Sequence, residues 1–88
     1  MSAALLVEIE ELFREVIDLE GVPFSGSCVL GRDIPVDSQD MLRVLSRVEA
    51  KYRFRFRPDR ILGLRTVADL VSAVADATAD DRRLGVRF

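Results

Sequence analysis

Apolar residues recur every three or four positions along the first part of this chain, and this spacing restricts the segment to α-helix. The recurring positions are Leu5, Ile9, Leu12, Phe13, Val16 and Ile17. Charged residues fall mainly between them, so one face of the helix is apolar and the other meets solvent. The pattern predicts an amphipathic helix over about residues 3–18.

The next segment is punctuated by residues that interrupt helices. These are Gly21, Pro23, Gly26, Gly31 and Pro35. Connections of this length are uncommon in compact domains, and this one also contains apolar residues such as Phe24 and Ile34. We therefore expect a long loop that packs over the helices and shields their core.

A second helix opens at the pair Asp37-Ser38, where either side chain can accept a hydrogen bond from a free amide of the first turn. The stripe predicted to be buried comprises Met41, Val44, Leu45, Val48 and Tyr52, and the opposite side carries Arg43, Arg47 and Lys51. Ser38 can therefore be a helix cap, a covalent attachment point, or both.

Two further helix signals follow. Pro58 and Gly63 bracket a short helix. Thr66, three residues before Asp69, resembles a capping box and precedes apolar residues at helical spacing up to about Thr78. These signals predict a third, short helix and a fourth, longer one.

Between the second and third helices, the run Arg53-Phe54-Arg55-Phe56-Arg57 alternates with period two. This alternation predicts a short extended segment that tucks both rings against the bundle. Because the rest of the chain is helical, the segment has no sheet to join.

The signals together predict an all-α fold, a bundle of three longer helices and one short helix with a long loop between the first two. We expect one domain over residues 1–79. Residues 80–88 are predicted to form a frayed tail, in which Leu84, Val86 and Phe88 could dock as a satellite contact.

Composition narrows the function. A chain of 88 residues makes one small domain with little room for a deep catalytic cleft. It has no histidine, the commonest general base, and Cys28 alone cannot form an internal disulfide or a multi-cysteine metal site. We therefore expect no catalytic residue and no metal. No apolar run approaches the ~20 residues that cross a bilayer and the start lacks the basic region of a signal peptide, so we expect a cytoplasmic protein.

The formal charge of −2 conceals an asymmetry. Residues 1–40 contain nine acidic residues against two arginines, whereas residues 41–65 contain eight basic residues against two acidic ones. The folded molecule should be strongly dipolar.

The order of elements resembles the acyl carrier protein family, over roughly residues 5–78. The anchor is Asp37-Ser38 at the head of the second helix. Further matches are Tyr52, where the family favours an aromatic residue, Pro58 near its Ile-Pro step, and Leu64-Arg65-Thr66-Val67, where it often has Ile-Thr-Thr-Val. This spacing is much rarer by chance than a bare Asp-Ser pair.

The resemblance implies that Ser38, beside Asp37, carries a 4'-phosphopantetheine arm, added from coenzyme A by a phosphopantetheinyl transferase in a magnesium-dependent step. It implies a carrier, not an enzyme, that acts as a monomer. Its further partners would be acyl-activating, condensing or acyl-transfer enzymes. Alternatively, Ser38 only caps the helix. For Asp37, capping and contact with the transferase are both open.

Several positions depart from the family pattern. Gln39 replaces the usual leucine. Arg43, Arg47 and Lys51 replace glutamates, and Ser46 replaces an exposed apolar residue. The resemblance places partner docking on Gln39, Leu42, Arg43, Ser46, Arg47 and Lys51. We expect a specialised lipid, polyketide or peptide-type pathway whose enzymes have acidic or mixed surfaces, rather than bulk fatty-acid synthesis. The alternative is a solvated face whose cations pair locally with Glu49 and with acids of the first helix.

In this family an acyl chain can withdraw between the second and third helices. The candidates to line that pocket are Leu45, Val48, Phe54, Phe56, Ile61 and Leu64. Large rings consume space, so long chains would be accommodated poorly. The alternative is that these residues only pack the core.

Two other functions are open. Arginines interleaved with Tyr52, Phe54 and Phe56 can form a nucleic-acid surface, but the acidic first half would repel phosphate, and we expect no nucleic-acid partner. The chain could also keep the carrier fold without the arm, as a structural or regulatory module.

Overall fold

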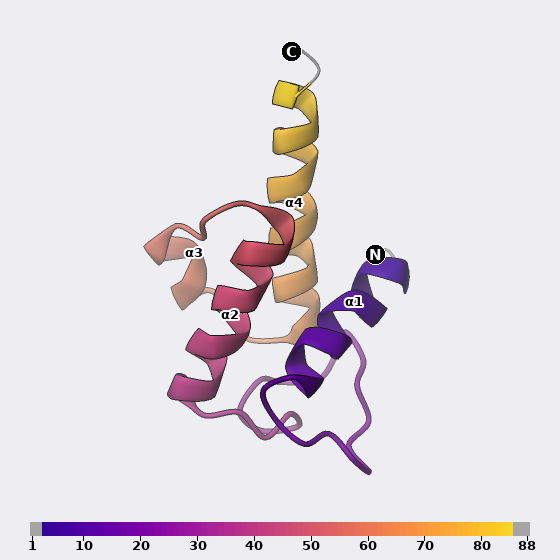
Figure 1. Ribbon diagram of the computed structural model, residues 1–88. Coiled ribbons are helices and arrows are strands. Elements are labelled where there is room, and N and C mark those ends of the chain that lie inside the picture. Colours follow the sequence, from indigo (N-terminus) through magenta and orange to yellow (C-terminus); the bar gives the residue numbers. More distant parts are fainter. Residues whose placement is uncertain (1–2, 86–88) are drawn as a thin grey trace.

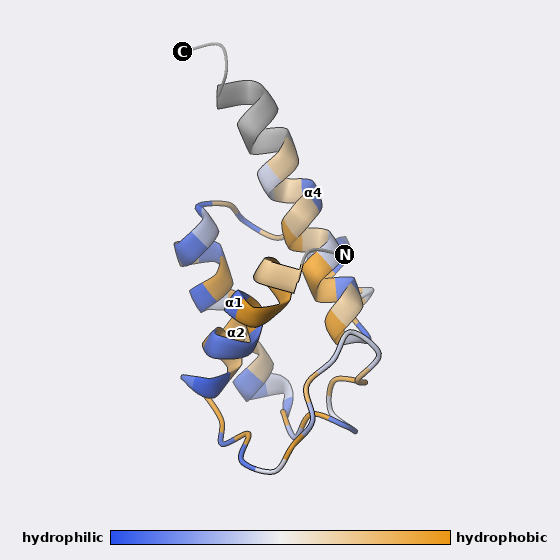
Figure 2. Ribbon diagram, turned by 90° about the vertical axis from the view of Figure 1, so that its right-hand side faces the viewer, coloured by the Kyte–Doolittle hydropathy of each residue, from blue (hydrophilic) through white to orange (hydrophobic). Residues whose placement is uncertain are grey.

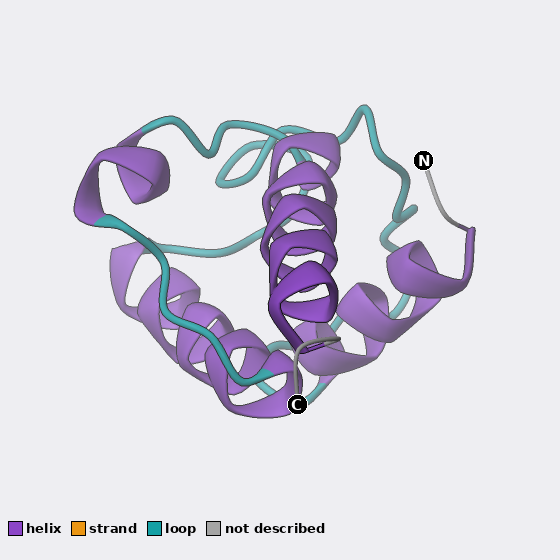
Figure 3. Ribbon diagram, turned by 90° about the horizontal axis from the view of Figure 1, so that it is seen from above, coloured by secondary structure: helices purple, strands orange, loops and turns teal. Residues whose placement is uncertain are grey.

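The computed structural model describes the backbone of residues 3–85 and the side chains of residues 3–79. It is an all-α bundle, as predicted (Figure 1). The four helices are α1 (Ala3–Arg14), α2 (Ser38–Tyr52), α3 (Pro58–Leu62) and α4 (Val67–Gly85). Within residues 3–85 there is no strand, and the only bridges are isolated ones between Val29 and Thr66 and between Leu30 and Ile34 (Figure 3).

The core lies where α1, α2 and α4 pack against one another. Their apolar faces turn inward, as the hydropathy colouring shows (Figure 2). The largest fully buried side chains are Phe13, Ile9, Ile34, Leu70, Val44, Val48, Val67, Val71 and Val74. Burying a side chain of this size contributes about 1.5–3 kcal/mol, so these faces hold the three long helices together. The short helix α3 contributes no buried residue and lies on the far side of α2 from α1 (Figures 1 and 3).

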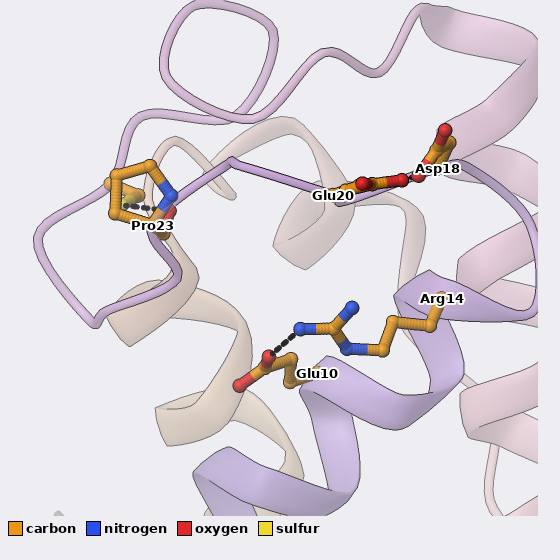
Figure 4. A network of polar contacts seen from close by, with 6 residues as sticks. Glu10, Arg14, Asp18, Glu20 and Pro23 are labelled. Atoms are coloured by element: carbon orange, nitrogen blue, oxygen red, sulfur yellow. Dashed lines mark hydrogen bonds and ion pairs between the residues drawn. The ribbon is translucent and has the colours of Figure 1, made fainter.

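Helix α1 ends at Arg14, so the predicted end at residue 18 was wrong. Beyond Arg14 the chain makes turns, because both Val16 and Ile17 donate their amides to the carbonyl of Phe13. The Asp18 carboxylate then accepts the Glu20 amide at 2.9 Å (Figure 4). Short polar side chains compete for backbone groups in this way and favour turns over helix. Inside the helix, Arg14 pairs with Glu10 at 2.6 Å (Figure 4).

Helix α4 continues to Gly85, so its predicted end at Thr78 was also wrong. Alanines recur at positions 73, 75, 77 and 79, across the predicted end, and favour helix there. Thr78 does not interrupt it, because its hydroxyl donates to the carbonyl of Val74 at 2.9 Å. The part of the expected frayed tail that the structure describes, up to Gly85, is therefore helical. The expected contacts of Leu84, Val86 and Phe88 lie outside the described side chains, and the domain boundary at residue 79 stays a prediction.

The long loop between α1 and α2 is packed, as predicted. Leu19, Ile34 and Val36 are buried, and the ring of Phe24 meets Phe13 edge to face with centroids 5.3 Å apart. The loop also accepts the first amides of α4. Val67 donates to the carbonyl of Cys28 at 3.0 Å, and Ala68 to that of Gly26 at 2.8 Å. These bonds fix the loop, and with it the chain entering α2.

Candidate functional site

Asp37, rather than Ser38, is the cap at the N-terminus of α2. Its backbone is extended, and its Oδ1 accepts the Asp40 amide at 2.7 Å. Its carbonyl accepts the Met41 amide at 2.9 Å. Ser38 is thus the first helical residue, and its side chain is exposed with no hydrogen-bond partner among the described residues.

The start of α2 also presents free donors. The amides of Ser38 and Gln39 have no acceptor in the described part of the chain, whereas the Asp40 and Met41 amides are both taken by Asp37. Unpaired amides and the positive end of the helix dipole together favour an anion. The Ser38 hydroxyl therefore stands where an attached phosphodiester would be stabilised.

A cavity of about 560 Å³ adjoins Ser38. It lies between the loop, the first half of α2 and α3. Its lining is Leu30, Gly31, Val36, Asp37, Ser38, Met41, Leu42, Leu45, Ile61 and Leu64. Apart from Asp37 and Ser38 at its edge, the side chains are apolar, so the cavity suits a hydrocarbon chain.

The six residues expected to form an acyl pocket lie in three places. Leu45, Ile61 and Leu64 line the cavity beside Ser38. Phe54 and Phe56 pack edge to face at 4.8 Å and line a different cavity, of about 460 Å³, next to α4. Val48 is fully buried in the core. The two rings therefore do not fill the space beside Ser38.

The sequence prediction missed the part of the cavity lining that comes from the loop and from Met41. Leu30 had been interpreted only as an apolar loop residue that shields the core, and Val36 had been given no role in a pocket. Both residues are apolar and lie within eight positions of Ser38, which could have indicated a role in the cavity. Their positions in the sequence, however, could not show that the loop folds back toward α3. The loop is held there by the Leu30 amide, which donates to the carbonyl of Arg65, between α3 and α4, at 2.9 Å.

The six residues expected to dock partners are all exposed along α2. They are Gln39, Leu42, Arg43, Ser46, Arg47 and Lys51. Leu42 is 62% exposed, one of the few large apolar side chains on the described surface. The structure thus leaves this face free for a partner.

The cations of this face have acidic partners within the chain. Arg43 lies 3.9 Å from Asp40 on the same helix. Arg47 lies 3.6 Å from Glu15, and Lys51 lies 3.9 Å from Glu8, so the basic side of α2 meets the acidic side of the α1 region. Exposed pairs of this kind contribute little stability, typically about 0–1 kcal/mol, but they reduce the net positive charge of the face.

Glu49 forms no ion pair among the described side chains, so the expectation that the cations of this face pair with Glu49 was wrong. Its Oε2 accepts the amide of Phe56 at 2.9 Å, and its carbonyl accepts the amides of Arg53 and Phe54. Glu49 therefore fixes the chain where it leaves α2.

No metal centre or membrane-spanning helix is present in the described part of the chain. No group of three acidic or cysteine side chains could hold a metal ion among the residues whose side chains are described. Cys28 is buried, and its Sγ lies 3.4 Å from the carbonyl of Pro23. No helix between residues 3 and 85 is long and apolar enough to cross a bilayer.

Comparison with known proteins finds a relative among curated proteins. No family model matches the chain. A curated acyl carrier protein of Acidothermus cellulolyticus is 30% identical to it over 74 residues, which cover 84% of this chain and 88% of the relative.

Proposed function

The chain belongs to the acyl carrier protein family, whose members are carriers rather than enzymes, and we propose that its Ser38 carries a covalent 4'-phosphopantetheine arm. One observation carries this proposal. Ser38 is an exposed hydroxyl at the first position of α2, unused by the fold because Asp37 does the capping. A serine that the fold does not need is available for modification.

The surroundings of Ser38 fit the arm. The free amides of Ser38 and Gln39 could receive the phosphodiester, and the apolar cavity beside them could receive a hydrocarbon chain. Attachment itself needs no base from this chain, since a phosphopantetheinyl transferase supplies the chemistry. When bound, the arm would supply a thiol on which acyl groups are held as thioesters.

We propose that the acyl chain enters the cavity lined by Leu45, Ile61 and Leu64 rather than the one lined by Phe54 and Phe56. Only the first cavity adjoins Ser38. If so, the volume of the cavity between the loop, α2 and α3 limits the length of the acyl chain that can be held.

The exposed face of α2 is the proposed docking surface for acyl-activating, condensing or acyl-transfer enzymes. Gln39 and Ser46 present polar groups next to exposed Leu42, while Arg43, Arg47 and Lys51 form a mixed surface with neighbouring acids. A surface of this kind is a poor match for enzymes that select a strongly acidic helix. We therefore propose a specialised lipid, polyketide or peptide-type pathway.

The second candidate is a carrier-like structural or regulatory module without the arm. The internal pairing of Arg47 and Lys51 with Glu15 and Glu8 favours it, because cations satisfied within the chain need no acidic partner. Modification chemistry separates the two candidates.

The test is incubation of the purified chain with coenzyme A, magnesium and a broad-specificity transferase, followed by intact mass. We expect a gain equal to one arm. The gain should vanish in Ser38→Ala and persist in the matched control Ser72→Ala, which removes another exposed serine on α4. No gain with several transferases would favour the unmodified module.

A further inference from the structure

Helix α3, which forms one wall of the cavity beside Ser38, is held only weakly by apolar packing. The helix has no buried residue, and Leu62 is 86% exposed. Ile61 and Leu64, which lies just beyond the end of α3, pack against the core but are only half-buried. The same two side chains line the cavity beside Ser38. The position of α3 therefore determines how wide this cavity is.

The backbone of α3 adds no connection to the other helices. The amides of residues 60, 61, 63 and 64 all donate to carbonyls of residues 57–61, so these hydrogen bonds stay within the segment. Its acidic residue, Asp59, also pairs locally, at 3.3 Å from Arg57. In the described part of the chain, therefore, neither the backbone of α3 nor its carboxylate fixes the helix to the bundle.

One ion pair bridges α3 and α4. The Nη2 atom of Arg60 lies 3.0 Å from Oδ2 of Asp76. Among the side chains that the structure describes, this is the sole ion pair or hydrogen bond between α3 and another helix. Two cavities, of about 460 and 200 Å³, are lined by residues of both helices, so α3 and α4 are not closely packed there (Figures 1 and 3). The bridge therefore holds α3 at its distance from α4 where packing does not.

The other acids near Arg60 that the structure describes already have partners. Asp59 pairs with Arg57, and Asp69, which lines the smaller cavity together with Arg60, accepts two backbone amides at 3.0 Å. Both side chains of the bridge are largely exposed, so the pair contributes little to the stability of the whole domain. Its contribution is local, because α3 has few other contacts that resist displacement.

We propose that Arg60 and Asp76 are specificity-determining residues, which set the length of the acyl chain that the cavity beside Ser38 accepts. The inference rests on the proposed carrier function, because the arm on Ser38 brings acyl chains to this cavity. The opposite walls are fixed, since Leu45 is buried in the core and Leu30 is hydrogen-bonded within the loop contact. A chain that outgrows the cavity must push α3 outward and break the bridge. The intact pair therefore limits chain length, and its loss should raise that limit.

The first measurement uses the unmodified full chain and follows hydrogen exchange at the amides of Ile61 and Leu64. Arg60→Gln should speed this exchange by up to about fivefold, the factor expected for the loss of one exposed ion pair. Arg60→Lys keeps the charge and should exchange as the parent does. The matched control, Arg14→Gln, breaks the Arg14–Glu10 pair within α1 and should leave the exchange at Ile61 and Leu64 unchanged.

The second measurement loads acyl groups of increasing length onto Ser38 and compares each melting temperature with that of the unacylated form of the same variant. In the parent, Arg60→Lys and Arg14→Gln, the gain should level off at the same chain length. In Arg60→Gln and Asp76→Asn it should level off at a longer chain, because α3 can then be displaced. A pair that only stabilised the fold would lower all melting temperatures and leave the levelling point where it is.

A levelling point that is the same in Arg60→Gln as in the parent, or that shifts equally in Arg14→Gln, would overturn the proposal. Unchanged exchange at Ile61 and Leu64 in Arg60→Gln would also overturn it, because α3 would then be held without the pair. A missing transferase mass gain refutes the carrier function instead, and the exchange rates, which need no arm, still decide whether the pair holds α3. Melting temperatures of the unacylated variants show that they fold.

Discussion

The phenol of Tyr52, at the end of α2, donates a hydrogen bond of 2.5 Å to Glu8 Oε1 on α1, across 44 positions of sequence. Burial raises the pKa of the Tyr52 phenol above its ordinary 10.0, and the hydrogen bond and negative charge of Glu8 raise that pKa further. Lys51 lies 3.9 Å from the same carboxylate oxygen. The contact fixes the C-terminal end of α2 against α1.

Tyr52→Phe is expected to lower the free energy of unfolding by about 1 kcal/mol at neutral pH, because Glu8 loses its donor. The pH dependence has a definite sign. A folded-state pKa above the unfolded value contributes stability that is present below pH 10 and is lost as pH rises toward the folded value. Urea unfolding at neutral pH and at about pH 11 should therefore show a larger alkaline loss in the parent than in Tyr52→Phe. Parallel curves would contradict the role given to Tyr52.

Asp37→Ala should destabilise the protein by about 1 kcal/mol, because the Asp40 amide loses its acceptor. Asp37→Asn should change stability little, since asparagine caps helices as well as aspartate does. Ser38→Ala, which removes no hydrogen bond within the described chain, should also be close to neutral. Thermal unfolding checks all three.

The asparagine variant also separates the two roles open to Asp37. If the carboxylate only caps α2, the rate of the transferase mass gain should be the same in Asp37→Asn as in the parent. A slower gain in a variant of unchanged stability would show that the transferase needs the charge.

Reversing the charge of the α2 face by Arg43→Glu with Arg47→Glu is expected to tighten binding to a fatty-acid ketosynthase about tenfold, because like-charge contacts are removed. The same change places new acids beside Asp40 and Glu15, so a small loss of stability accompanies it. Binding measured at low and high salt checks both the direction and its electrostatic origin. Unchanged affinity would mean that the face does not set partner choice.

Local signals in the sequence predicted the architecture well. The helix starts at Asp37 and Thr66 depend on residues within one turn, and the reciprocal bonds between Thr66 and Asp69 are present. The two backbone amides that Asp69 accepts, from Arg65 and Thr66, hold the pKa of its carboxylate below the usual value. Such caps involve residues that are neighbours in the sequence, so they can be predicted from the sequence alone.

Helix ends and long-range contacts were harder to predict. The end of α1 depends on the turns in which Val16 and Ile17 both donate to the carbonyl of Phe13, and that of α4 on helix propensity rather than on a stop signal. The pairing of Arg47 with Glu15 depends on how two helices face each other. The cavity beside Ser38 depends on a loop whose course is fixed by Leu30 donating to Arg65. None of these can be obtained from periodicity.

The two cavities make different predictions for an attached acyl chain. If the chain enters the cavity beside Ser38, loading acyl groups of increasing length should raise the melting temperature stepwise, because each buried methylene adds up to about 0.8 kcal/mol. Ile61→Phe should reduce this gain by filling that cavity, whereas Ala77→Phe fills the cavity lined by Phe54 and Phe56 and should leave the gain intact. Each gain is measured against the unacylated form of the same variant, which removes the cost of the substitution. A gain abolished by Ala77→Phe alone would place the chain beside the phenylalanines, and a melting temperature independent of chain length would show that neither cavity holds it.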